Sequence, residues 1–429
     1  MSNTKQMARR RNVFSAISNS LILRNRTLLG VSLAVFAAYT GAGMVGPVRV
    51  LYAQQQGASL VIIDAMASAF LVSNFLFQYP VGWLADHRGR KQIIIIGLLA
   101  QALIAAAYLP VSNPTLFIVL RFVEGIGSAA ILPPARALIV DNVPPEQQGE
   151  AYGTFSAFYY AGFLLGPGIG GMIATWGYST AFIGAIVTRL VAVVIVMLMV
   201  TATVVHKTPA DAPQLDVTIT EPVITKHSLY RALFILPLVG AYILAFGDYL
   251  YLGFDMTLMP LWMHDHLKAT VVVIGIAYMT WSLPTMLLSP FTGRVADRKR
   301  RSTLILIFGL AQVPLYITYG LANTALLVVI IFGIHGIVYA FIQPAVDASV
   351  AAASLSGVRA RVQGLYTTVG LFGAFIGASA FSWLYALNFR LPLYALGLGY
   401  GLCVLIGGLL IRRAEQRAKH APYEVGDGG

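Results

Sequence analysis

Ionisable residues stand at several points inside long apolar stretches of this sequence. Arg121 and Glu124 are three residues apart in one stretch, and Asp248 and Asp255 are seven apart in another that is rich in aromatic residues. Both spacings place two side chains on one face of a helix. Arg121 and Glu124 can therefore form an ion pair, whereas paired carboxylates can bind a cation or relay protons.

Each of these residues also has a plainer interpretation. Arg121 and Glu124 could form a permanent structural ion pair, and Asp248 could be held by a structural partner. Asp255 could be hydrated near the outer end of its stretch. His335, in a further apolar stretch, is expected to hydrogen-bond within a helix bundle rather than to titrate.

The overall composition explains why charges inside these stretches are informative. Hydrophobic residues make up 58% of the 429 residues and charged residues 11%, compared with about 25% charged in ordinary soluble domains. So few charges cannot cover so much apolar surface in water, whereas a lipid bilayer solvates apolar side chains directly. The sequence therefore predicts an all-α membrane protein whose surroundings are the lipid bilayer.

Several other classes of function are disfavoured. The single cysteine, Cys403, excludes a disulfide framework and a paired-cysteine metal site. The sequence contains no phosphate-binding glycine loop and no His, Asp and Glu cluster with the spacing of metal ligands. We therefore expect no catalytic activity, no cofactor and no metal.

The net charge of +12 follows from the placement of the basic residues. They are concentrated in every second connection between apolar runs, while the other connections contain little beyond Arg49, Lys268 and Arg390. This asymmetry is typical of the positive-inside rule, and it predicts that both termini are cytoplasmic. The positive charge thus reports membrane topology rather than a nucleic-acid surface.

Twelve apolar runs are long enough to span a bilayer, which takes roughly twenty residues of helix. We expect a cytoplasmic tail over 1–27, a six-helix bundle over 28–203, a polar linker over 204–228, a second six-helix bundle over 229–411 and a tail over 412–429. The predicted spans are 28–50, 60–84, 92–110, 115–138, 152–174, 180–203, 231–262, 270–293, 302–321, 325–346, 362–384 and 392–411.

An internal repeat relates the two predicted bundles at a constant offset of 211 residues. Gly82, Ala85 and Asp86 recur as Gly293, Ala296 and Asp297; Gly125 and Pro133 as Gly336 and Pro344; and Gly153, Gly162 and Gly166 as Gly364, Gly373 and Gly377. An even number of spans in each copy makes the repeats parallel, so the fold class is two pseudo-symmetric six-helix bundles.

The connection between the second and third spans, GWLADHRGRK over 82–91, carries the most specific motif. Gly82 permits close helix approach, Gly89 permits a tight reversal, and Asp86 can pair with basic residues or with a helix N-terminus. Arg90 is a further candidate of this gating loop. This segment resembles the cytoplasmic loop signature of the major facilitator superfamily, whose twelve-helix transporter fold the whole chain would then share. Asp297 belongs to a degraded second copy.

The fifth span carries glycines that resemble the antiporter motif of the drug:proton branch of that superfamily. Glycines four residues apart allow close packing and a proline bends the helix, so generic helix packing is the alternative explanation. Arg121 similarly resembles the start of a proton-linked motif, although the family more often has glutamine where Glu124 stands. The glycine motif comprises Gly153, Gly162, Gly166, Pro167, Gly170 and Gly171.

The resemblance implies a proton-coupled exporter of lipophilic or cationic small molecules, monomeric, in a bacterial cytoplasmic membrane. Protons would load Glu124 or Asp248, with Arg121 and Asp255 as further candidates. The alternatives are an exporter or flippase of one metabolite, sugar or lipid, and a receptor or assembly subunit that transports nothing. Candidates for lining a substrate cavity are Tyr39, Tyr159, Tyr249, Trp281 and Tyr339.

Overall fold

The computed structural model describes residues 25–143, 148–201, 232–354 and 359–420, and in these ranges it contains helices and no strands. Twelve helical segments of the described part are long and apolar enough to cross a membrane. The predicted all-α class and the predicted number of spans are therefore confirmed. The linker predicted over 204–228 lies outside the described residues.

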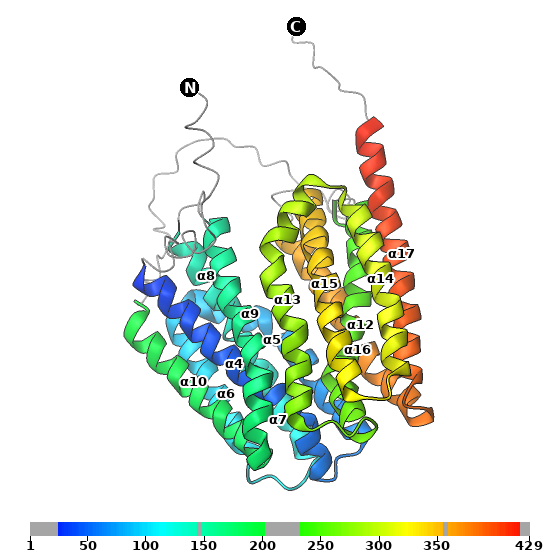
Figure 1. Ribbon diagram of the computed structural model, residues 1–429. Coiled ribbons are helices and arrows are strands. Elements are labelled where there is room, and N and C mark those ends of the chain that lie inside the picture. The colour runs from blue at the N-terminus through cyan, green and yellow to red at the C-terminus, as the bar shows by residue number, and fades with distance from the viewer. Residues whose placement is uncertain (1–24, 144–147, 202–231, 355–358, 421–429) are drawn as a thin grey trace, which may run out of the picture. The chain divides into compact units, whose positions relative to one another are not determined.

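The described helices group into two compact units. The first unit holds seven of the α-helices described, and Thr270–Met279 is grouped with it. Figure 1 shows its helices running from blue at α4 to green at α10. They are α4 (Arg26–Gln55), α5 (Leu60–Arg88), α6 (Arg90–Ala107), α7 (Leu116–Ala129), α8 (Leu132–Asp141), α9 (Gln148–Ile173) and α10 (Ser179–Met199), with the 3-10 turn η2 (Ala174–Trp176) after α9.

The second unit repeats the main helix pairing of the first. Here α12 packs against α16 and α17, as α4 packs against α9 and α10 in the first unit. The second unit contains α12 (Leu236–Asp265), most of α13 (Val271–Arg298), α14 (Arg301–Leu321), α15 (Ala325–Ala353), α16 (Arg359–Leu387) and α17 (Leu391–His420).

The fourth predicted span is broken into two helices. We expected one helix over 115–138, but α7 ends at Ala129 and α8 begins at Leu132. Pro133 and Pro134 follow the break, and neither can donate the backbone hydrogen bond that would continue a helix. Pro344 stands alone inside α15, which stays continuous from Ala325 to Ala353. Two adjacent prolines thus interrupt this span where a single one does not.

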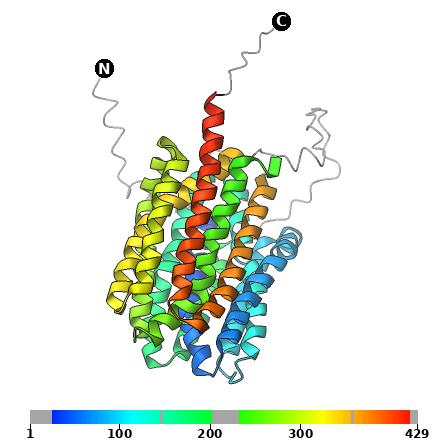
Figure 2. The same ribbon diagram turned by 90° about the vertical axis from the view of Figure 1, so that its right-hand side faces the viewer.

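The last described helix, α17, extends further than its predicted span over 392–411. A tail was expected over 412–429, but α17 continues to His420, and Figures 1 and 2 show its last turns (red) projecting past the rest of its unit. Most residues after Arg413 favour helix. In addition, the carboxylate of Glu415 accepts hydrogen bonds from the Ser302 backbone N–H (3.2 Å) and hydroxyl (2.6 Å). This contact caps the start of α14 and fixes α17 beside it.

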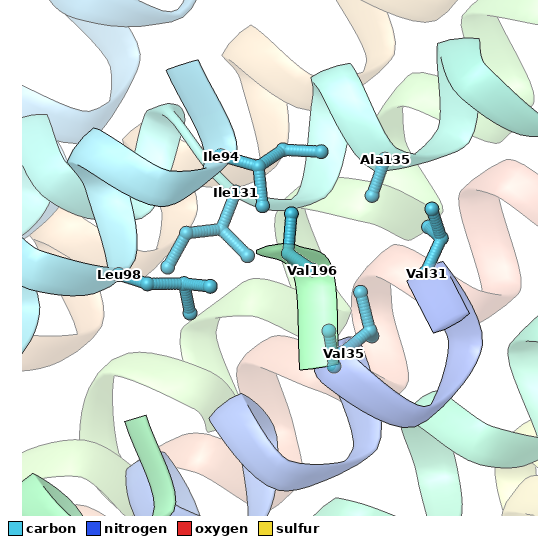
Figure 3. Close-up of a pocket in the computed structure, with 8 residues that line it drawn as sticks. Val31, Val35, Ile94, Leu98, Ile131, Ala135 and Val196 are labelled. Atoms are coloured by element: carbon cyan, nitrogen blue, oxygen red, sulfur yellow. The ribbon is translucent and has the colours of Figure 1, made fainter. Parts of the chain in front are cut away.

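A dry apolar core holds the first unit together. Figure 3 shows apolar side chains from helices of this unit converging on one another. They leave no room for a water molecule, as expected of a close-packed interior. The labelled residues are Val31 and Val35 on α4, Ile94 and Leu98 on α6, Ala135 on α8, Val196 on α10, and Ile131 just before α8.

Candidate functional site

A buried ion-pair cluster lies in the first unit. The Glu124 carboxylate accepts hydrogen bonds from Arg49 Nη2 at 2.8 Å and from Arg121 Nη1 at 3.1 Å. Arg121 is 3% exposed and Glu124 6% exposed, and the Arg121 guanidinium also stacks over the Phe70 ring at 4.0 Å. The predicted pairing of Arg121 with Glu124 is therefore confirmed.

Two further polar residues extend this cluster. Gln101 Nε2 donates to the backbone oxygen of Glu124 at 2.7 Å. Arg189 Nη2 donates to Gln101 Oε1 at 3.4 Å, and Arg189 Nη1 donates to the Ala185 backbone oxygen at 3.1 Å. Arg189, for which the sequence gave no role, is thus tied to the same network. Three guanidinium groups surround a single carboxylate in this part of the unit.

Arg49 is the member of this cluster that sequence reasoning missed. We counted it with the charges of a connection because it stands at the end of the span predicted over 28–50. Instead α4 continues to Gln55, and the side chain of Arg49 is only 11% exposed. Because Glu124 holds two arginines, a proton added to its carboxylate would leave both without their counter-ion. The geometry fits a structural cluster better than a proton-loading site.

The second unit holds a different kind of acidic site around Asp248. Tyr339 donates its hydroxyl to Asp248 Oδ2 at 3.2 Å, and the same hydroxyl lies 3.1 Å from Gln343 Oε1. Gln343 Nε2 in turn donates to Asp347 Oδ1 at 3.0 Å. Asp255 has its own partner, because Tyr251 donates to Asp255 Oδ1 at 3.3 Å. The two carboxylates on α12 therefore have separate hydroxyl partners.

Asp248 differs from Glu124 in having no basic partner among the residues that the structure describes. None of the ion pairs in the described ranges includes it. Within the described ranges, the titratable groups that interact with it electrostatically are tyrosines and one carboxylate, each neutral or negative. They are Tyr316, Tyr339, Tyr366, Tyr400 and Asp347.

His335 forms a buried hydrogen-bond network, as the sequence predicted. Its Nε2 lies 3.1 Å from Gln312 Oε1, and its Nδ1 lies 3.4 Å from the Tyr319 hydroxyl. Tyr316 donates to the same Gln312 oxygen at 3.1 Å. A neutral imidazole with its hydrogen on Nε2 satisfies all three contacts. His335, at 1% exposed, is thus held within the bundle.

The aromatic cavity candidates divide between the two units. In the first unit, Tyr39 and Tyr159 pack edge to face with ring centroids 4.5 Å apart. In the second, the Trp281 and Tyr339 rings lie 5.3 Å apart, which puts Trp281 beside the partner of Asp248. Tyr249 instead packs against the backbone of α16 at Gly370. Trp281 and Tyr339 are therefore the candidates that the structure brings to an acidic residue.

The loop signature forms a charged turn at one end of the first unit. Gly89 joins α5 directly to α6 with a positive φ of 98°, a conformation that favours glycine. Arg90 pairs with Asp86 at 3.4 Å and also with Asp141 at the end of α8. The expected pairing of Asp86 with a basic residue is confirmed, and Asp141 is a partner that the motif alone did not indicate.

Of two other loop residues, Gly82 differs from the expectation and Asp297 is not tested. Gly82 was expected to allow close helix approach, but a Cβ built there would meet no atom within 4 Å in the described structure. Asp297 lies in the last turn of α13, and its side chain is outside the described part. In this second copy Arg301 donates to the backbone oxygen of Ala348 at 2.8 Å, where Arg90 of the first copy binds a carboxylate.

The glycine motif forms the contact surface between α9 and α4. A Cβ added at Gly162 would lie 2.7 Å from the Phe36 oxygen, and one at Gly166 would lie 2.6 Å from the Thr40 oxygen. Gly170 repeats the pattern against Met44. Glycines spaced by four thus let two backbones touch along two helical turns. Of the remaining positions, Gly153 and Pro167 lie in α9, and Gly171 approaches Val271, which is grouped with the same unit.

We expect Gly166→Ala to destabilise the protein by about 1–3 kcal/mol, because backbone atoms of α4 occupy the space that the methyl group needs. The measurement is the Tm of the purified protein in detergent. Gly46→Ala on α4 is the matched control, since a Cβ at Gly46 would meet no atom within 4 Å. Equal Tm values for the two variants would show that the glycines of α9 are not in close contact with α4.

Comparison with known proteins agrees with the motifs. Residues 31–258 and 241–426 each match the family description of the Major Facilitator Superfamily. Quinolone resistance protein NorA of Staphylococcus aureus is 29% identical over 158 residues, which cover 37% of this chain and 41% of NorA. An uncharacterized MFS-type transporter of Methanocaldococcus jannaschii is 32% identical over 142 residues, or 33% of this chain and 37% of the relative. The matches thus span well under two thirds of these relatives.

Solved structures share the fold over nearly the whole chain. A bacterial homolog of the human lysosomal transporter Spinster, in an inward-facing and unoccupied conformation, aligns with a TM-score of 0.70 at 16% identity, covering 91% of this chain and 97% of the other. The human organic anion transporter MFSD10 aligns with a TM-score of 0.62 at 16% identity, covering 90% and 99%. At such identities the likeness concerns the fold alone. With both halves of the sequence matched, the chain belongs to the major facilitator superfamily.

Proposed function

We propose that the protein is a secondary active transporter that exports lipophilic, cationic small molecules in exchange for protons. The observation that carries this proposal is the environment of Asp248. Its carboxylate lies among tyrosines and another acidic residue, with no basic partner in the described structure. The positive charge that complements it must then be a proton or a cationic ligand.

A carboxylate that binds either a proton or a cation is a simple basis for antiport. Both ligands are positive, so each lowers the affinity of the site for the other. A proton arriving from outside would displace the outgoing solute, and its release to the cytoplasm would restore the site. Trp281 and Tyr339 would add aromatic surface for a lipophilic cation, since their rings adjoin the Asp248 site.

The first unit would have a supporting role in this scheme. The carboxylate of Glu124 is already paired with Arg49 and Arg121, and the glycines of α9 hold it against α4. The likeness to a protein named for quinolone resistance supports a drug as the exported solute. We place the protein in a bacterial cytoplasmic membrane, as a monomer with both termini in the cytoplasm.

Proteoliposomes with an imposed pH gradient test this proposal. We expect ethidium, a lipophilic cation, to move against its own gradient only while the proton gradient is present, and a protonophore to stop it. A neutral dye and an organic anion of similar size serve as controls and should not be concentrated.

The other outcomes separate the alternatives. Movement of the anion or of one specific metabolite in place of ethidium would favour a dedicated exporter. Absence of gradient-dependent flux for every compound in the panel would overturn the proposed function.

A further inference from the structure

One face of α15 carries a row of polar side chains, and the first of them is hydrogen-bonded to Asp248 of α12. Tyr339, Gln343 and Asp347 are each four residues apart, so they lie one above the other on the helix. Hydrogen bonds of 3.2, 3.1 and 3.0 Å join Asp248 to Tyr339, Tyr339 to Gln343, and Gln343 to Asp347. The row therefore links a half-buried carboxylate to an exposed carboxylate about 12 Å further along α15.

The hydroxyl of Tyr339 is the point at which this row can change. It lies within hydrogen-bonding distance of two acceptors, Asp248 Oδ2 and Gln343 Oε1. A phenol has one hydrogen, so it can donate to only one of them at a time. A charged acceptor forms the stronger hydrogen bond, and the charge on Asp248 therefore decides where the hydrogen points.

We propose that Tyr339 is a positioning residue that converts proton binding at Asp248 into a hydrogen-bond switch along α15. While Asp248 is ionised, the Tyr339 hydroxyl donates to its carboxylate. Once a proton from solvent binds Asp248, the new carboxyl O–H donates to the Tyr339 oxygen. The tyrosine hydrogen then turns to Gln343 Oε1. This inference rests on the proposed function, because it takes Asp248 to be the proton-binding group.

The groups described around Asp248 supply no positive charge, so the switch depends on the proton that binds this carboxylate. The described titratable groups that interact with it are tyrosines of α14, α16 and α17, and Tyr339 and Asp347 of α15. On α12 itself, Tyr249 is the neighbouring phenol and Asp255 is bonded to Tyr251. No arginine or lysine of the described residues is within ion-pair distance of Asp248.

The far end of the row meets the loop region of the second unit. Asp347 precedes Ala348, whose backbone oxygen accepts the hydrogen bond from Arg301 at the start of α14. Arg301 belongs to the second copy of the loop signature, which we expect to face the cytoplasm. When Gln343 Oε1 is bound by Tyr339, its amide is held with Nε2 toward Asp347. Proton binding inside the bundle would thus stiffen α15 next to that loop.

The test uses pH-induced infrared difference spectra of the full-length protein. The band of interest is the protonated-carboxyl band that Asp248→Asn removes. Tyr339→Phe deletes the donor to the carboxylate, so we expect the band midpoint to move up by about one pH unit. Gln343→Leu deletes the alternative acceptor, so the midpoint should move down. Tyr319→Phe, a buried hydroxyl bonded to His335, is the control and should leave it unchanged.

If Tyr339 had only a structural role, the band midpoint would not shift in opposite directions in folded Tyr339→Phe and Gln343→Leu. Unchanged midpoints in Tyr339→Phe and Gln343→Leu, with Tm values near that of wild type, would overturn the switch. The switch would also be overturned if Asp248→Asn removed no protonated-carboxyl band. The spectra need no substrate, so they test the switch independently of transport. If proteoliposomes show no gradient-driven transport, the proposed function fails, but the band midpoints still decide whether the switch exists. If Tyr339→Phe fails to fold, Gln343→Leu alone decides.

Discussion

Asp248→Asn is expected to abolish proton-driven export while leaving the fold intact. The amide oxygen of asparagine can still accept the hydrogen bond from Tyr339, which is 3.2 Å long in the wild type, so packing is preserved. The variant loses the negative charge that would bind a proton or a cation. Losing one partner of a buried charge pair costs about 2 kcal/mol or more, so affinity for a cationic probe should fall at least about 30-fold.

Two measurements check this expectation. Ethidium binding to wild-type protein in weakly buffered detergent solution should release protons, and binding to Asp248→Asn should release none. Gradient-driven uptake into proteoliposomes should disappear in the same variant. Asp255→Asn is the matched control, because it removes a carboxylate from the same helix that is bonded to Tyr251 instead. Retention of proton-driven uptake in Asp248→Asn would remove Asp248 from the mechanism.

Glu124→Gln is expected to act on stability rather than on coupling. The glutamine would leave the buried Arg121 and Arg189 and the half-buried Arg49 around a neutral side chain. Breaking a buried ion pair from one side typically costs about 3–5 kcal/mol, because it leaves uncompensated charge. We therefore expect a fall in Tm on the order of 5 °C or more, together with a lower yield of monodisperse protein.

A double variant distinguishes this role from proton loading. Removing one arginine along with the carboxylate, as in Glu124→Gln with Arg49→Gln, should recover part of the lost stability. Arg49→Gln alone is the reference, since it leaves Glu124 paired with Arg121 at 3.1 Å. If Glu124→Gln keeps a wild-type Tm but loses the pH dependence of transport, Glu124 is the coupling residue and our assignment to Asp248 is incorrect.

The membrane spans could be predicted well because their signal is long and local. Each apolar run must be about twenty residues, and all twelve runs are present as helices. The break after Ala129 shows where such reasoning is incomplete. Hydropathy does not respond to Pro133 and Pro134, although their missing backbone donors determine where α7 stops.

The candidate site could be predicted only in part, because its important contacts join distant segments. Spacing within one helix was enough to pair Arg121 with Glu124, but Arg49 reaches the same carboxylate across 75 residues of sequence. Similarly, Tyr339 binds Asp248 across 91 residues. Tyr339 was chosen only as an aromatic candidate, since nothing near it in the sequence indicates an acidic partner.

The hydrogen bonds between Glu415 and Ser302 hold the C-terminal turns of α17 in a fixed position beside α14. Because the carboxylate accepts hydrogen bonds from both the backbone N–H and the hydroxyl of Ser302, α17 is bound to α14 beyond its last apolar turn. A helical protein fused in continuous register after Arg417 should be held at a fixed angle to this bundle, and each residue inserted at the junction would rotate it by about 100°. Such a fusion would give a small membrane protein the extra mass and shape that particle alignment in electron microscopy requires.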